Sequence, residues 1–140
     1  MIIDASVWVA IFRGNDVHHA VSMRFLETAI AARQNLHLPN LALAEIAGVF
    51  ARQTGSSRLA SRTLNAVLAV PRLQHHEFTD PMADRAAALA ARCKLRGADA
   101  VYVSLAEALE LPLISLDTEI LERSTRVVTA LTPAGWLKTS

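Results

Sequence analysis

The sequence predicts an α/β domain, a three-layer α/β/α sandwich around a mainly parallel five-stranded sheet. Five short apolar segments alternate with longer segments whose apolar residues recur at helical spacing. This alternation is typical of parallel sheets, because each parallel strand is joined to the next by a crossover that is usually helical. With 140 residues and no linker or internal repeat, the chain is expected to form one domain over residues 1–140.

The first half of the chain is expected to form strand, helix, helix, strand, helix and helix. Val17, Val21 and Phe25 recur four residues apart and predict an apolar stripe along the second helix. Pro39 stops the second strand, and Gly55-Ser56-Ser57 separates the last two helices. The expected segments are residues 1–3, 5–12, 17–34, 36–38, 41–53 and 58–70.

The second half is expected to continue with a strand, two helices, a strand, a short helix and a last strand. Asp80-Pro81 favours a helix start, and Gly97 separates the two long helices. The expected segments are residues 73–78, 80–95, 99–109, 113–116, 117–123 and 126–129, followed by an ordered tail at 133–137. Trp8 and Trp136 lie in apolar surroundings and are expected to pack in the core.

Composition indicates the class of protein but does not identify its partners. The chain is 52% hydrophobic and 19% charged, which excludes a disordered chain, and its net charge of +1 does not decide whether it binds nucleic acid. The single cysteine, Cys93, cannot form an internal disulfide and is expected to be buried in a reducing compartment. Without a signal-peptide pattern or a long apolar run, we expect a cytoplasmic protein with no membrane contact.

Two aspartates follow predicted strands. Asp4 comes directly after the first strand, and Asp117 closes the strand at 113–116. Parallel sheets present ligand-binding groups at the carboxyl ends of their strands, which favours a site here. The alternative is that each aspartate only caps the helix that follows it, a role that suits aspartate well.

Glu45 and Asp99 interrupt apolar helix faces. The neighbours of Glu45 at helical spacing include Leu41 and Val49, so its carboxylate is expected to face inward. A buried carboxylate must be protonated, paired with a cation such as an arginine, or bound to metal. Asp99 has Tyr102 on its helical face, and its alternative role is a plain helix cap.

Four carboxylates gathered in one place would repel one another unless divalent cations neutralised them. Oxygen-only ligands suit Mg²⁺ or Mn²⁺, whereas zinc prefers histidine and cysteine. The histidine pairs His18-His19 and His75-His76 lack ligand-like spacing and are expected to be surface or packing residues. A bound Mg²⁺ activates water for attack on a phosphodiester, so phosphodiester hydrolysis is the predicted chemistry.

In order along the chain, four segments strongly resemble the PIN-domain family, and VapC-type toxins in particular. They are Ile2-Ile3-Asp4-Ala5-Ser6, then Glu45, then Arg96-Gly97-Ala98-Asp99-Ala100-Val101-Tyr102, then Leu113-Ile114-Ser115-Leu116-Asp117. The resemblance implies that Asp4, Glu45, Asp99 and Asp117 are the catalytic acids that hold Mg²⁺. It also implies that Ser6 orients Asp4 and that Ser115 supports the site, with Glu119 as an alternative fourth acid.

The same resemblance implies what the protein does. It points to a Mg²⁺-dependent endoribonuclease that is the toxin of a type II toxin–antitoxin pair and cleaves structured RNA such as tRNA or rRNA. A cognate small antitoxin and a homodimer are the implied protein partners. Arginines that are candidates for steering the RNA backbone, or else for simple solvated helix faces, are Arg13, Arg52, Arg58, Arg62 and Arg96.

Two rival readings remain. Phosphatases of the HAD type also carry an aspartate after the first strand, but they require a second aspartate at the position that Ser6 occupies here. A PIN-like module that only binds RNA or protein is the second rival, and the presence of all four acids argues against it.

Overall fold

A five-stranded sheet forms the centre of the structure, a computed structural model that describes residues 1–139. All pairings are parallel, in the order β3-β2-β1-β4-β5. The strands are β1 (Ile2–Ile3), β2 (Leu36–Pro39), β3 (Leu73–His76), β4 (Leu113–Ile114) and β5 (Ala130–Leu131). The predicted α/β class and its five-stranded sheet are therefore confirmed, and the sheet is parallel throughout rather than mainly so.

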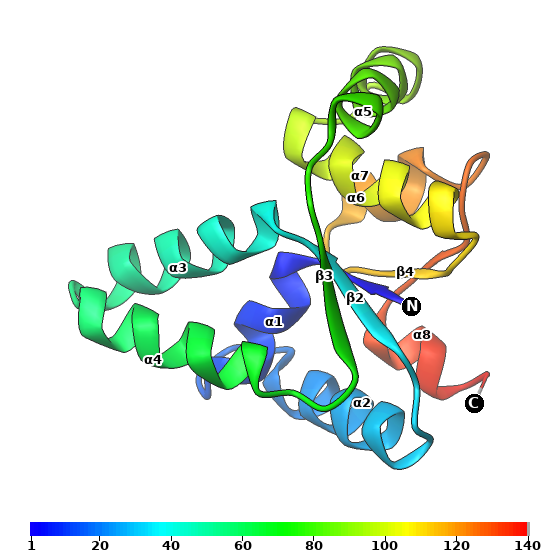
Figure 1. Cartoon of the computed structure of the whole chain (residues 1–140). Coiled ribbons are helices and arrows are strands. Elements are labelled where there is room, and N and C mark those ends of the chain that lie inside the picture. Colours follow the sequence, from blue (N-terminus) through cyan, green and yellow to red (C-terminus); the bar gives the residue numbers. More distant parts are fainter. Residues whose placement is uncertain (140) are drawn as a thin grey trace.

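Helices cover both faces of this sheet (Figure 1). In Figure 1, α1, α2 and α8 lie below the sheet and α5, α6 and α7 above it, while the α3–α4 hairpin extends to the left. Helix α6 packs on β1, β2 and β4, and α5 packs on α6. The helices are α1 (Ala5–Phe12), α2 (His19–Ala31), α3 (Leu41–Thr54), α4 (Ser57–Leu68), α5 (Asp80–Cys93), α6 (Gly97–Leu109), α7 (Thr118–Arg123) and α8 (Pro133–Leu137).

The register of the two central strands determines where the site forms. Ile3 pairs with Ile114, and the Asp4 amide donates to the Ile114 carbonyl at 3.0 Å. Both strands therefore end at the same level, and the residues that follow them, Asp4 and Ser115, meet at the carboxyl edge of the sheet.

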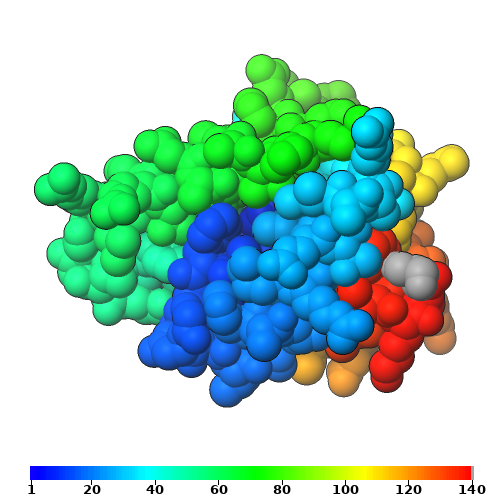
Figure 2. All heavy atoms as spheres, turned by 90° about the horizontal axis from the view of Figure 1, so that it is seen from below, coloured from blue at the N-terminus to red at the C-terminus, as the bar shows by residue number. Residues whose placement is uncertain are grey.

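The core lies on both sides of the sheet and includes both tryptophans, as predicted. Trp8 is fully buried, and Trp136 places its ring edge-on to Phe25, with ring centroids 5.2 Å apart. This contact joins α8 to α2, which lie side by side although they come from opposite ends of the chain (Figure 2). None of the helices within residues 1–139 is long and apolar enough to cross a membrane.

The last predicted strand, residues 126–129, is wrong. The amides of Val127 and Val128 both donate to the Ser124 carbonyl, at 2.8 and 3.0 Å, so these residues form a turn after α7. The chain must reverse before it can run parallel to β4, and it pairs only at Ala130–Leu131. The β-branched residues indicated a strand, but the turn required here overrides that local preference.

The predicted helix at 17–34 also starts too early. The Asp16 carboxylate accepts the His18 amide at 2.9 Å, which forms a local turn, and α2 begins at His19. Val17 is 91% exposed and belongs to no apolar stripe.

Two predicted strands are shorter than expected. The strand predicted at 73–78 ends at His76 and the one at 113–116 ends at Ile114. Cys93, expected to be buried, is only partly so.

Candidate active site

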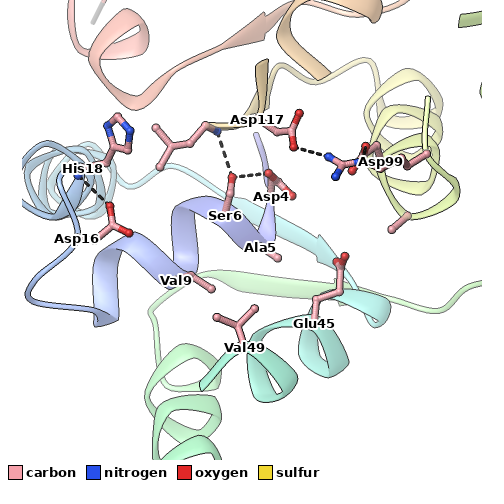
Figure 3. A pocket seen from close by; sticks show the side chains of 13 residues that line it. Asp4, Ala5, Ser6, Val9, Asp16, His18, Glu45, Val49, Asp99 and Asp117 are labelled. Atoms are coloured by element: carbon pink, nitrogen blue, oxygen red, sulfur yellow. Dashed lines mark hydrogen bonds and ion pairs between the residues drawn. The ribbon is translucent and has the colours of Figure 1, made fainter. Parts of the chain in front are cut away.

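The four predicted acids line one cavity at the carboxyl edge of the sheet (Figure 3). Asp4 follows β1, Glu45 lies on α3, Asp99 lies in the first turn of α6, and Asp117 precedes α7. The cavity has a volume of about 480 Å³. Other residues that line it include Ser6, Val9, Asp16, His18, Val49 and Arg96. Residues far apart in the sequence thus present four carboxylates to one space.

Two hydroxyls hold Asp4 at the base of the site. Ser6 and Ser115 both donate to Asp4 Oδ2, Ser115 at 2.8 Å. Ser6 also accepts the Leu116 amide at 3.1 Å, which ties α1 to the end of β4. Asp4 is only 6% exposed, and its side chain does not cap α1. The contact expected between Ser6 and Asp4 is present, and the plain capping role is absent.

Burial raises the pKa of Asp4 to about 6. The two serine hydrogen bonds oppose this shift, whereas the nearby carboxylates of Glu45 and Asp99 add to it. A carboxyl that resists ionisation for these reasons gains the most from a nearby cation, because the cation offsets both the burial and the repulsion.

Glu45 has a partner that the sequence reading did not anticipate. The Tyr102 hydroxyl donates to Glu45 Oε2 at 2.5 Å, whereas the alternatives weighed for this carboxylate were protonation, pairing with a cation such as an arginine, or metal binding. Burial raises the pKa of Glu45, and the Tyr102 hydrogen bond opposes that shift. Burial raises the pKa of the Tyr102 hydroxyl as well, so it stays a donor at neutral pH.

Arg96 bridges two of the acids. Its Nε donates to Asp99 Oδ2 at 2.8 Å and its Nη2 to Asp117 Oδ2 at 2.5 Å. Glu119 lies further out, 3.7 Å from Arg96 Nε. The Arg96 side chain is 62% exposed, so the guanidinium covers the acids at the mouth of the site. Arg96, rather than Asp99, also occupies the N-cap position of α6.

Asp117 caps a helix and also faces the cavity. Its Oδ1 caps α7 by accepting the amides of Glu119 and Ile120, at 2.8 and 3.3 Å. Its Oδ2 faces the cavity and pairs with Arg96. Glu119 does not line this cavity within the described residues, which favours Asp117 over Glu119 as the fourth acid.

The donor set fits a hard divalent cation in its chemistry. The candidate ligands are all carboxylate oxygens, which Mg²⁺ and Mn²⁺ prefer, and their mutual repulsion is one that a cation would relieve. In residues 1–139 no three His, Cys, Asp or Glu side chains are arranged as a ready-made metal site. Arg96 already pairs with Asp99 Oδ2 and Asp117 Oδ2, so a cation bound by these same oxygens would have to displace it.

Sequence reasoning missed two residues that line the cavity. Asp16 and His18 come from the turn before α2 and face the site from the side opposite Asp99 (Figure 3). No periodicity marked them, because they belong to neither a helix face nor a strand end. Among the predicted backbone-steering arginines, Arg96 alone lines this cavity in the described part of the chain. Arg13 instead forms an ion pair with Asp16, with 3.8 Å between Arg13 Nη1 and Asp16 Oδ2.

The chain belongs to the PIN domain family, whose model matches residues 1–125. This assignment agrees with the resemblance seen in the sequence motifs, and it removes the phosphatase reading. No curated protein sequence matches the chain.

Solved structures, VapC toxins among them, share the fold. VapC20 of Mycobacterium tuberculosis, described as a toxin that cleaves the sarcin-ricin loop, is 17% identical with a TM-score of 0.71, covering 85% of this chain and 91% of that one. VapBC2 from Rickettsia felis, bound to a DNA fragment from its promoter, is 14% identical with a TM-score of 0.73, covering 94% and 96%. PAE2754 from Pyrobaculum aerophilum is 24% identical with a TM-score of 0.67, covering 92% and 81%.

Proposed function

We propose that the protein is a Mg²⁺-dependent endoribonuclease. The observation that carries the proposal is the convergence of Asp4, Glu45, Asp99 and Asp117 on one open cavity at the carboxyl edge of a PIN-domain sheet. Buried and half-buried carboxylates that repel one another cost free energy, and a divalent cation used in catalysis would account for their presence.

Each residue has a distinct part in this proposal. Asp4, Glu45 and Asp99 hold the metal, with Asp117 at the outer side, and bound Mg²⁺ supplies a Lewis acid that lowers the pKa of water. Ser6 and Ser115 fix the Asp4 carboxylate, and Tyr102 fixes that of Glu45. Arg96 lies at the mouth, where its exposed guanidinium can move from the acids to a phosphate of the substrate.

The cellular role that we propose is the toxin of a type II toxin–antitoxin pair, working in the cytoplasm. VapC20 supports this role because it shares the fold and is described as a toxin that cleaves the sarcin-ricin loop. Solved complexes with the same fold, such as the toxin–antitoxin complex from Klebsiella pneumoniae, support a small antitoxin as partner. Homodimerisation and structured RNA such as tRNA or rRNA as substrate belong to the same proposal.

The direct test is cleavage of total cellular RNA by the purified protein. Three samples are compared: the protein with Mg²⁺, the protein with a chelator, and Asp99→Asn with Mg²⁺. Discrete fragments are expected only in the first, and sequencing of their ends would identify the substrate. Identical RNA patterns in all three samples would overturn the nuclease proposal in favour of an RNA- or protein-binding module.

A further inference from the structure

A second, basic cavity lies beside the acidic one. It has a volume of about 450 Å³ and forms between the C-terminal end of α5 and the end of α7 with the turn that follows. Three arginines, Arg92, Arg123 and Arg126, line it against a single acid, Glu122. All three side chains belong to exposed residues, so the cavity opens to solvent with an excess of positive charge.

The three arginines differ in how many close partners they have. Arg123 donates to the Lys94 carbonyl and lies 3.2 Å from Glu119 Oε1, so it is anchored on two sides. The side chains of Arg92 and Arg126 make no hydrogen bond or ion pair within residues 1–139. The charge of Arg92 helps to lower the pKa of Glu107, but only at longer range. Two guanidinium groups without close partners line the same cavity, and such a pair of positive charges suits an anionic ligand.

One carboxylate, that of Glu119, pairs with an arginine of each cavity. Glu119 pairs through Oε1 with Arg123 and through Oε2 with Arg96, whose other contacts are the catalytic acids Asp99 and Asp117. The basic cavity therefore begins one side chain beyond the mouth of the acidic one. Because a polynucleotide carries one charge per residue, a strand held at the acidic site has neighbouring phosphates that a basic cavity at this position is able to bind.

We propose that Arg92, Arg123 and Arg126 form an accessory phosphate-binding cavity that holds the backbone of the RNA substrate next to the cleavage site. This inference rests on the proposed ribonuclease function and assigns the substrate's path over the surface. Guanidinium groups suit phosphate because their planar donors match its oxygens, and several separate arginines suit a ligand with repeated charges. Backbone contacts of this kind position the RNA and carry no sequence preference.

The first test is binding of a short fluorescein-labelled oligouridylate, followed by fluorescence anisotropy in chelator so that no cleavage occurs. The double variant Arg92→Gln/Arg126→Gln spares the anchored Arg123 and is expected to bind on the order of tenfold more weakly. The slope of log affinity against log salt should fall by about 1.4, since each lost single-strand phosphate contact removes about 0.7.

The matched control is Arg24→Gln/Arg33→Gln, which removes the same charge from exposed positions on α2 and just after it, on the side of the sheet opposite α5 and α7 (Figure 1). This control is expected to bind as the unmodified protein does. Equal weakening in both double variants would mean that only net charge matters, and it would overturn the proposed cavity.

Cys93 supplies a second, local readout. It is the chain's single cysteine and lines the basic cavity, so iodoacetamide reports on that cavity alone. The oligouridylate is expected to slow its alkylation, and the Arg92→Gln/Arg126→Gln variant should lose this protection. Alkylation at the same rate with and without oligouridylate would exclude RNA as the occupant. Because these measurements use chelator, they are independent of the cleavage assay, which tests the nuclease proposal separately.

Discussion

The guanidinium of Arg96 lies between the carboxylates of Asp99 and Asp117, bonded to the first through Nε and to the second through Nη2. These contacts raise the pKa of Arg96, with the Asp99 hydrogen bond as the largest cause. The charged side chain therefore neutralises two of the acids from within the chain. A divalent cation that binds the same carboxylates competes with it.

Arg96→Gln is therefore expected to bind Mg²⁺ more tightly. Removing a positive charge a few ångströms from a divalent cation changes affinity by about tenfold in a water-screened site. Isothermal titration with Mg²⁺ measures the effect. Arg85→Gln is the control, because it loses the same charge from an ion pair with Glu107 outside the acidic cavity. Unchanged Mg²⁺ affinity in Arg96→Gln would show that Arg96 does not compete.

Ser6→Ala is predicted to impair cleavage beyond its effect on stability. The hydroxyl donates to Asp4 and accepts the Leu116 amide, so its loss leaves that amide unsatisfied and Asp4 with the Ser115 hydrogen bond, at a cost of about 1–3 kcal/mol of unfolding free energy. Urea denaturation and RNA cleavage should be measured together.

The matched control for this variant is Ser56→Ala. Ser56 caps α4 by accepting the Leu59 amide, and its loss costs about 1 kcal/mol far from the acids. We expect the control to lose stability but to keep cleavage. Equal cleavage in Ser6→Ala and Ser56→Ala would contradict a positioning role for Ser6.

Tyr102→Phe should loosen Glu45 without disturbing the core around it. The ring is almost fully buried and is retained, so the main loss is one hydrogen bond to a carboxylate, about 1.5–3 kcal/mol. Mg²⁺ affinity and RNA cleavage are both expected to fall, because the Glu45 carboxylate is no longer fixed. Stability and Mg²⁺ affinity equal to those of the unmodified protein would show that the hydrogen bond contributes nothing.

Sequence pattern predicted the parts of the fold that depend on local periodicity. The strand before Asp4 and the helix that carries Glu45 follow from apolar spacing alone. The strand predicted at 126–129 failed because the return of the chain to β4 is a long-range requirement that no local window contains. Val17 was wrongly placed in a helix for a similar reason, since the turn formed by Asp16 and His18 delays the start of α2 to His19.

The candidate site was predictable in its acids and not in their partners. Asp4 and Asp117 stand at strand ends, a position that a parallel sheet makes accessible. The Tyr102–Glu45 hydrogen bond joins residues 57 positions apart, and nothing in either helix alone indicates it. The same holds for the arginines of the basic cavity, which come from α5 and from the end of α7 and beyond.

A histidine pair across β2 and β3 predicts a pH-dependent stability. His37 Nδ1 and His76 Nε2 lie 3.0 Å apart, so one ring donates a hydrogen bond to the other. The accepting nitrogen must carry no proton, so at least one of the two rings has to be neutral. Burial, the Met1 ammonium and His76 lower the pKa of His37 to about 4. Burial and His75 lower the pKa of His76.

Because the folded protein holds His37 neutral, the unfolded chain binds more protons as the pH falls. The stability from His37 is therefore fully present above its ordinary pKa of 6.5 and is lost as the pH falls toward 4, by about 3 kcal/mol. Urea denaturation across this range should show the loss, and His37→Asn should flatten it, since asparagine does not titrate. Parallel stability curves for the two proteins would rule out the histidine pair as the cause.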